Sequence, residues 1–228
     1  MTTPTREPRA VPPLEAGDRL TRPEFERRYE AMPGLKKAEL IDGVVYLPSP
    51  TRFRKHGQPH GRVVAWLVTY AAATSGVEAA DNVTTRLDND NEPQPDVALR
   101  IETERGGRSH IDDEDYLVGG PELVCEVASS TVSYDLGPKL QTYRRPGVLE
   151  YVVWRFRDRA VDWFVLREGS YVVLPPAAGG ILKSEAFPGL WLDPAALVAG
   201  DMARVLDVLR QGLGSAEHAE FRRRLGAP

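Results

Sequence analysis

The stretch "LVCEVASS", residues 123–130, decides how the chain folds, because it reads as a short buried β-strand with a carboxylate in its middle. Apolar residues occupy both of its faces, which is typical of a strand covered on both sides by other elements. Glu126 lies at its centre. An unpaired carboxylate in such a place costs several kcal/mol or more. We therefore expect a neighbouring group to share its charge.

A second acid is predicted to lie beside the first. Alternate residues of a strand face the same side of the sheet, so Glu126 faces away from Cys125. In "QPDVALR", residues 94–100, Asp96 opens another strand after Pro95. If the two strands are neighbours, Asp96 and Glu126 meet on one side of the sheet. Adjacent carboxylates repel each other. Mg²⁺, which often uses one or two carboxylates and keeps several waters, removes that repulsion.

Lys139 supplies a cation near the same place. It lies in the first turn of a short helix predicted for "GPKLQTYRRPG", residues 137–147. Side chains on a helix lean toward its N-terminus, so Lys139 leans back toward the strand that carries Glu126. An ammonium there can orient a water or stabilise charge that develops on a phosphate. Tyr143 lies one turn further along the same helix face.

The rest of the chain alternates helix and strand patterns. Helices are predicted over 21–34, 60–76, 200–213 and 216–225, and strands over 76–80, 83–87, 96–101, 121–129, 149–156, 160–169 and 170–176. A hairpin is predicted over 38–48, since β-forming residues flank Asp42-Gly43, a pair that type I′ turns prefer. Helix, strands, helix and strands in this order indicate an α/β domain with a mixed sheet.

Composition limits the classes of function. The chain has 228 residues, a net charge of −4 and a single cysteine, Cys125, which cannot form an internal disulfide. The acidic balance argues against a broad basic surface for nucleic acid, though not against a local basic groove. No stretch is long and apolar enough to span a membrane, and the start of the chain lacks a signal-peptide pattern, so we expect a cytoplasmic protein without membrane contact. Residues 1–17 are rich in proline and are expected to form a flexible N-terminal arm.

Five segments in order resemble a known family. The "PD" at 95–96, "EVA" at 126–128 and "KLQTYRRPGVLEYVVW" at 139–154 resemble the PD-(D/E)XK nuclease superfamily. With "AELIDGVVYLPSP" at 38–50 and "EAFPGLWLDPAAL" at 185–197, they look like its Uma-two branch. This resemblance implies a restriction-endonuclease-like three-layer α/β domain over 18–200, with a central mixed β-sheet flanked by helices. Residues 201–228 would form a C-terminal helical extension packed on it.

The resemblance also assigns roles to residues. Asp96 resembles the first metal ligand, and Glu126 the acidic residue of the second half-motif. The usual lysine of the superfamily would fall two residues after the glutamate, where this chain has Ala128. The Uma-two pattern places the lysine on the following helix, which matches Lys139. Glu39 matches an additional N-terminal acid.

The activity that the resemblance implies is Mg²⁺-dependent hydrolysis of phosphodiester bonds in DNA by an endonuclease, with Mn²⁺ able to substitute. Asp96 and Glu126 would hold the metal ion, and Lys139 would position the water or stabilise the transition state. Glu39 would support the site or bind a second ion, while His60 and Tyr143 would line it. Many nucleases of this fold cut both strands as dimers, so a homodimer is expected on the same ground.

The residues by themselves leave other interpretations open. The chain could be a catalytically inactive nuclease-fold protein that binds nucleic acid or a protein partner, or a metal-dependent hydrolase of another phosphate ester. The alternative roles of the site residues are a strand-start turn residue for Asp96, a buried ion pair with Arg100 for Glu126, a solvated helix lysine for Lys139 and an exposed hairpin charge for Glu39.

Two histidines four residues apart have the spacing of zinc ligands on a helix. Gly57 and Pro59 lie between His56 and His60, however. We therefore expect the helix to start near Pro59, with the two histidines on different faces and without a zinc site.

Overall fold

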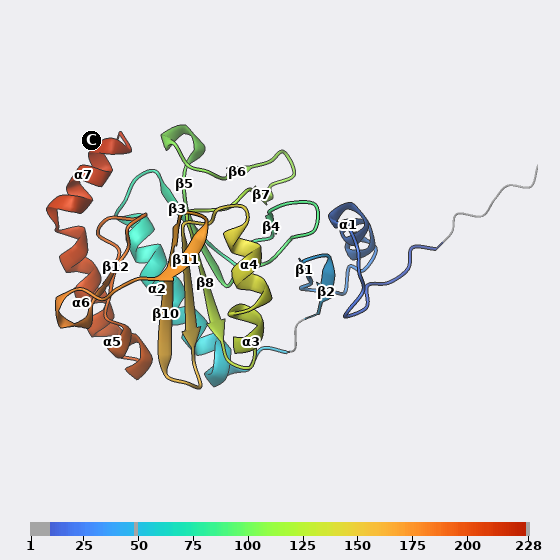
Figure 1. The fold of residues 1–228 in the computed structure, drawn as a ribbon, viewed down its shortest axis with the longest axis horizontal. Coiled ribbons are helices and arrows are strands. Elements are labelled where there is room, and N and C mark those ends of the chain that lie inside the picture. The colour runs from blue at the N-terminus through green and yellow to red at the C-terminus, as the bar shows by residue number, and fades with distance from the viewer. Residues whose placement is uncertain (1–9, 48–49, 227–228) are drawn as a thin grey trace, which may run out of the picture.

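A six-stranded β-sheet forms the centre of the molecule in the computed structural model, which describes residues 10–47 and 50–226 (Figure 1). The strand order is β11-β10-β9-β8-β5-β3. The strands are β3 (Val77–Asp81), β5 (Val97–Ile101), β8 (Leu123–Ala128), β9 (Glu150–Arg155), β10 (Ala160–Arg167) and β11 (Ser170–Val173). Only β8 and β9 pair in parallel among these neighbours, so the sheet is mixed, as the sequence predicted.

Strand alternation sorts the core into two layers. On one face of β8, Leu123, Cys125 and Val127 pack into a large apolar cluster with helix α2 (Gln58–Ala72). On the other face, Val124 and Ala128 pack with the helical segment α3 (Val132–Asp135) and α4 (Pro138–Arg144). The predicted three-layer α/β architecture is confirmed, since helices cover both faces of the sheet (Figure 1).

The C-terminal helices complete the first of these layers. They are α5 (Pro194–Ala199), α6 (Met202–Leu213) and α7 (Ala216–Arg224). Val205 and Leu209 of α6, together with Phe221 and Leu225, belong to the same buried cluster as the strands. The segment 201–226 therefore contributes to the main core.

A smaller apolar cluster holds the N-terminal part. It joins α1 (Arg22–Glu30) to the hairpin of β1 (Glu39–Ile41) and β2 (Val44–Tyr46). The hairpin turn is the predicted one, because Asp42 and Gly43 have φ of 51° and 71°. The flexible arm was expected over 1–17, of which 1–9 lie outside the described residues. Within 10–17 the expectation is wrong at Leu14, which is buried in this cluster.

The remaining elements are short. A three-stranded sheet contains β4 (Thr85–Arg86), β6 (His110–Ile111) and β7 (Leu117–Val118), and a two-stranded sheet pairs β12 (Leu182–Lys183) with β13 (Trp191–Leu192). Two 3₁₀ turns span Thr103–Arg105 and Ala178–Gly180, and a π-helical turn, η1 (Phe53–Gly57), leads directly into α2. Within the described ranges, no helix has both the length and the apolar character needed to cross a membrane.

Candidate active site

Strand register brings the two predicted acids together. β5 runs antiparallel to β8, with Val97 opposite Cys125, so Asp96 and Glu126 occupy the next opposed positions. The backbone N–H of Asp96 lies 3.4 Å from Glu126 Oε2, and the N–H of Val127 donates to Asp96 Oδ2 at 2.7 Å. Both carboxylates are buried. The prediction that they meet on one side of the sheet is confirmed.

Lys139 shares the charge of Glu126. Its Nζ lies 2.7 Å from Glu126 Oε1 and 2.9 Å from Glu39 Oε1, and the side chain is only 4% exposed. The lysine is thus not a solvated helix residue. The alternative partner, Arg100, pairs with Glu78 instead and donates to Ser109.

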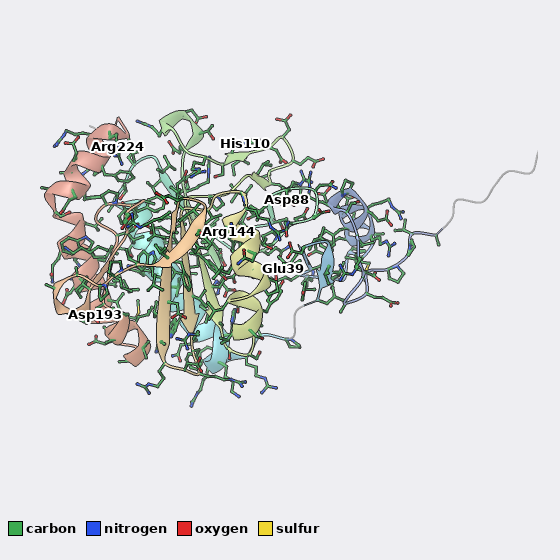
Figure 2. All side chains as sticks on the ribbon, viewed as in Figure 1. Glu39, Asp88, His110, Arg144, Asp193 and Arg224 are labelled. Atoms are coloured by element: carbon green, nitrogen blue, oxygen red, sulfur yellow. The ribbon has the colours of Figure 1, made fainter. Side chains whose placement is uncertain are left out.

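Glu39 and Tyr143 complete the immediate surroundings of the lysine and the glutamate. Glu39 Oε1 accepts a hydrogen bond from the backbone N–H of Gln94 at 2.8 Å, and the residue is buried, so it is not an exposed hairpin charge. Glu39 projects from the hairpin toward α4 (Figure 2). The Tyr143 hydroxyl donates to Glu126 Oε1 at 2.9 Å. The structure therefore places β1, β5, β8 and α4 around one cluster.

The two histidines lie side by side, contrary to our expectation. His56 Nε2 is 3.2 Å from Asp96 Oδ1, and His60 Nε2 is 2.9 Å from the Asp96 carbonyl oxygen. Their ring centroids are 5.7 Å apart. Helical structure continues through Gly57, because η1 runs into α2 without a break.

The site holds more carboxylates than cations. Burial acts to raise the pKa of Glu126, and the neighbouring Lys139 acts to lower it. Burial also lowers the pKa of Lys139 by itself, but Glu126 and Glu39 raise it well above its usual value. For Asp96, burial acts to raise the pKa, but the hydrogen bond and charge of His56, the Val127 N–H and Lys139 together lower it below its usual value. That same bond raises the pKa of His56.

Asp135, at the end of α3, is a further buried acid that sequence reasoning missed. Burial raises its pKa to about 6, and Lys139 acts in the opposite direction. Its Oδ2 has no hydrogen-bond partner among the described residues. His56 was also missed as a site residue. Its signal was the four-residue spacing to His60.

The donor set suits a small hard cation. Carboxylate oxygens are the ligands that Mg²⁺ prefers, and the ion often uses one or two of them together with waters. No group of three or more His, Cys, Asp and Glu side chains in the described part of the chain is arranged to hold a metal ion. Asp96 and Glu126 could therefore supply two carboxylate ligands to such an ion, and waters would have to supply the others.

The comparisons with known proteins agree with this geometry. The model of the Uma2 family, described as "Putative restriction endonuclease", matches residues 22–195. The chain belongs to the Uma2 family. This is the Uma-two branch that the sequence segments resemble, so that prediction is confirmed. The family match covers the acids, the lysine and both histidines.

One solved structure shows a similar fold. The Uma2 chain is similar to a crystal structure from Anabaena variabilis described as "a putative nuclease belonging to DUF820", with a TM-score of 0.52 and 13% identity over 80% of this chain and 97% of that one. The type IIG restriction endonuclease BpuSI is matched with a TM-score of 0.35 and 15% identity, over 67% of this chain and 16% of that one. No curated protein matches the chain.

Proposed function

We propose that this Uma2 protein is a Mg²⁺-dependent endonuclease that hydrolyses phosphodiester bonds in DNA, with Mn²⁺ able to replace Mg²⁺. The observation that carries the proposal is the position of Lys139. From a helix that follows the strand, its Nζ contacts Glu126 at 2.7 Å beside Asp96. Two acids and a lysine are thereby assembled although Ala128 occupies the usual lysine position.

Asp96 and Glu126 are the residues that would hold the metal ion, since the Asp96 N–H points to the Glu126 carboxylate and the Asp96 carboxylate accepts from the N–H of Val127, the next residue on β8. When bound there, Mg²⁺ would polarise the phosphate and lower the pKa of a bound water.

Lys139 has one donor left for the substrate. An ammonium group has three N–H donors, and two are directed at Glu126 and Glu39. The third can donate to the attacking water or to a phosphate oxygen, where it would stabilise developing negative charge. Glu39 positions the lysine, because the Gln94 N–H fixes the same oxygen that contacts Nζ. Tyr143 restrains Glu126 through its hydroxyl.

A cleavage assay tests the proposal. Supercoiled plasmid and single-stranded DNA would be incubated with Mg²⁺ or Mn²⁺ and with wild type, Asp96→Asn, Glu126→Gln or Lys139→Met. We expect cleavage by wild type only, and full cleavage by Glu104→Gln, which changes an exposed acid in the same way. Cleavage that survives in all three site variants contradicts the proposal.

One observation favours a second candidate, a catalytically inactive protein that keeps the fold and binds nucleic acid or a partner protein. Protein groups already engage both Asp96 oxygens, namely His56 and the Val127 N–H. Isothermal titration with Mn²⁺ separates the two candidates. Binding that Asp96→Asn abolishes supports the nuclease, and a wild type that binds no metal supports the inactive protein.

We also propose a homodimer, because cutting both strands of a duplex is readily achieved by two copies of one site. Sedimentation equilibrium of the full chain, alone and with duplex DNA, tests it. A monomer under both conditions contradicts it.

A further inference from the structure

We propose that an exposed basic and aromatic surface beside the site binds the DNA strand. The inference rests on the proposed function and names the part of the chain that holds the substrate. We call it the η1 surface. It has two parts. The first, called the η1 side, is formed by Arg52, Phe53, Arg54 and Lys55, and the second by Arg157 and Arg159 in the β9–β10 turn.

The η1 side is anchored directly to the acids. His56, within η1, contacts Asp96 Oδ1 through Nε2, and its Nδ1 lies 3.2 Å from the carbonyl oxygen of Val127. Phe53 begins the same turn, three positions before the histidine. The turn that carries the exposed side chains is therefore anchored at Asp96 through His56.

Phe53 is an exposed aromatic residue without a packing role. Its side chain is 76% exposed, more than any other large apolar side chain in the described part of the chain. A solvent-facing aromatic ring costs free energy without contributing to the core. Such a ring is a platform on which a nucleic-acid base can stack.

The cations around Phe53 are free to bind phosphate. Arg52, Arg54 and Lys55 are exposed and form no ion pair with any residue that the structure describes. Several exposed arginines elsewhere do form ion pairs. Arg27 pairs with Glu24, Arg210 with Asp207 and Arg223 with Glu220.

The β9–β10 turn brings further cations to the same edge of the sheet. β8 and β9 are parallel, so their C-terminal ends lie together, and the Phe156 N–H donates to the Ala128 carbonyl at 2.9 Å. Arg157 and Arg159 follow and are exposed, again without an ion pair to a described residue. The intervening acid, Asp158, is paired with Arg155.

Exposed hydroxyl groups follow the C-terminal end of β8. Ser130 and Thr131 follow β8 and are exposed at this edge. Side chains with nitrogen tips project from the lower edge of the sheet (Figure 2). Cations and hydroxyls are the groups that bind DNA phosphates, and the local positive charge contrasts with a net charge of −4 for the chain.

Binding is measured separately from cleavage. Fluorescence anisotropy would follow labelled duplex and single-stranded DNA of one sequence with the full chain in EDTA, across a range of salt concentrations. We expect Phe53→Ala to weaken single-strand binding about tenfold or more, the effect of losing one stacked base. We expect Arg54→Ala/Lys55→Ala to lower the slope of log K against log salt on duplex DNA by about 0.9 for each phosphate that is no longer neutralised.

Matched controls separate this surface from general effects. Arg210→Ala/Arg223→Ala removes the same charge on α6 and α7, and Val173→Ala truncates another exposed apolar residue, which is 66% exposed. Wild-type affinity and slope in these controls, with weaker binding in the η1 variants, support the proposal. The proposal is overturned if both sets of variants bind equally weakly or if the η1 variants bind as wild type does. It is also overturned if wild type does not bind DNA. The nuclease proposal is judged independently by the cleavage assay.

Discussion

Lys139 on α4 donates to Glu126 on β8 at 2.7 Å, a buried contact between residues thirteen positions apart in the chain. The contact offsets the free-energy cost of burying a carboxylate within a strand. It also brings an ammonium group to the side of the sheet where Asp96 lies.

Removal of the lysine charge is expected to affect both stability and cleavage. In Lys139→Met, Glu126 and Glu39 keep their burial but lose their shared cation. Breaking a buried ion pair in this way costs about 3–5 kcal/mol of unfolding free energy. In the proposed mechanism Lys139 stabilises transition-state charge, so its loss is expected to slow cleavage by about 10²–10³-fold. Urea denaturation and plasmid cleavage measure the two effects.

The double variant Lys139→Met/Glu126→Gln distinguishes them. It removes both charges, so we expect it to regain part of the lost stability and none of the lost cleavage. Recovery of cleavage would show that the lysine only balances charge.

A lysine at the usual position of the superfamily is not expected to replace Lys139. Ala128 is fully buried and packs with Tyr143, Tyr151 and Val153 on the α4 side of the sheet. A lysine there would place an unpaired charge in an apolar layer, at a cost of several kcal/mol or more. We expect Ala128→Lys/Lys139→Ala to be less stable than Lys139→Ala alone and equally inactive in plasmid cleavage. Restored cleavage would contradict this account.

Glu150 is a buried carboxylate with a structural role. Its oxygens accept hydrogen bonds from Trp163 Nε1, Ser184 Oγ and the backbone N–H groups of Glu185 and Ala186. We expect Glu150→Ala to lose at least about 3 kcal/mol of unfolding free energy, because each buried donor without an acceptor costs about 1–3 kcal/mol.

Cleavage per folded molecule distinguishes Glu150 from the site acids. Glu150 packs with Trp163 on the α2 side of the sheet, away from Asp96 and Glu126. Activity normalised to the folded fraction from circular dichroism is therefore expected to match wild type in Glu150→Ala. A loss of normalised activity like that of Glu126→Gln would place Glu150 in the site.

Glu92 is expected to make stability depend on pH. Burial, and then the neighbouring carboxylate of Glu26, raise the pKa of Glu92 from 4.5 to about 9. The folded state thus holds a proton that the unfolded chain releases. The stabilising contribution is fully present below pH 4.5 and is lost as the pH rises toward 9.

Urea denaturation at several pH values between 6 and 9 measures this effect. The slope of the unfolding free energy against pH can reach roughly 1.4 kcal/mol per pH unit for one group. We expect Glu92→Gln, which can still donate to Glu26, to remove the Glu92 component of the slope. Glu104→Gln, at an exposed acid, should leave the slope unchanged. Parallel curves for wild type and Glu92→Gln would show that Glu92 is ionised in the folded protein.

Local patterns were enough to predict several parts of the site. Strand alternation placed Glu126 on the side of Asp96, and the lean of helix side chains aimed Lys139 at Glu126. The Asp42-Gly43 turn identified the hairpin that carries Glu39. Each of these inferences depends on backbone geometry over a few residues.

Other parts depended on contacts between distant segments. The sequence breaks at Gly57 and Pro59 indicated that His56 lies off the helix, whereas a π-helical turn keeps it beside Asp96. Leu14 reads as part of a polar arm, yet α1 and the hairpin bury it. No local pattern reports which distant surface will cover a short segment.

Side-chain periodicity and turn chemistry are properties of neighbouring residues, so the strands, the helices, the hairpin turn and the face of each acid could be read along the chain. The pairing of β5 with β8, and the convergence of α4 and β1 on Glu126, required the folded molecule. The position of His56 beside Asp96 did so too. Strand order and helix packing depend on the burial of surfaces that are far apart in the chain, and that burial is a property of the whole fold.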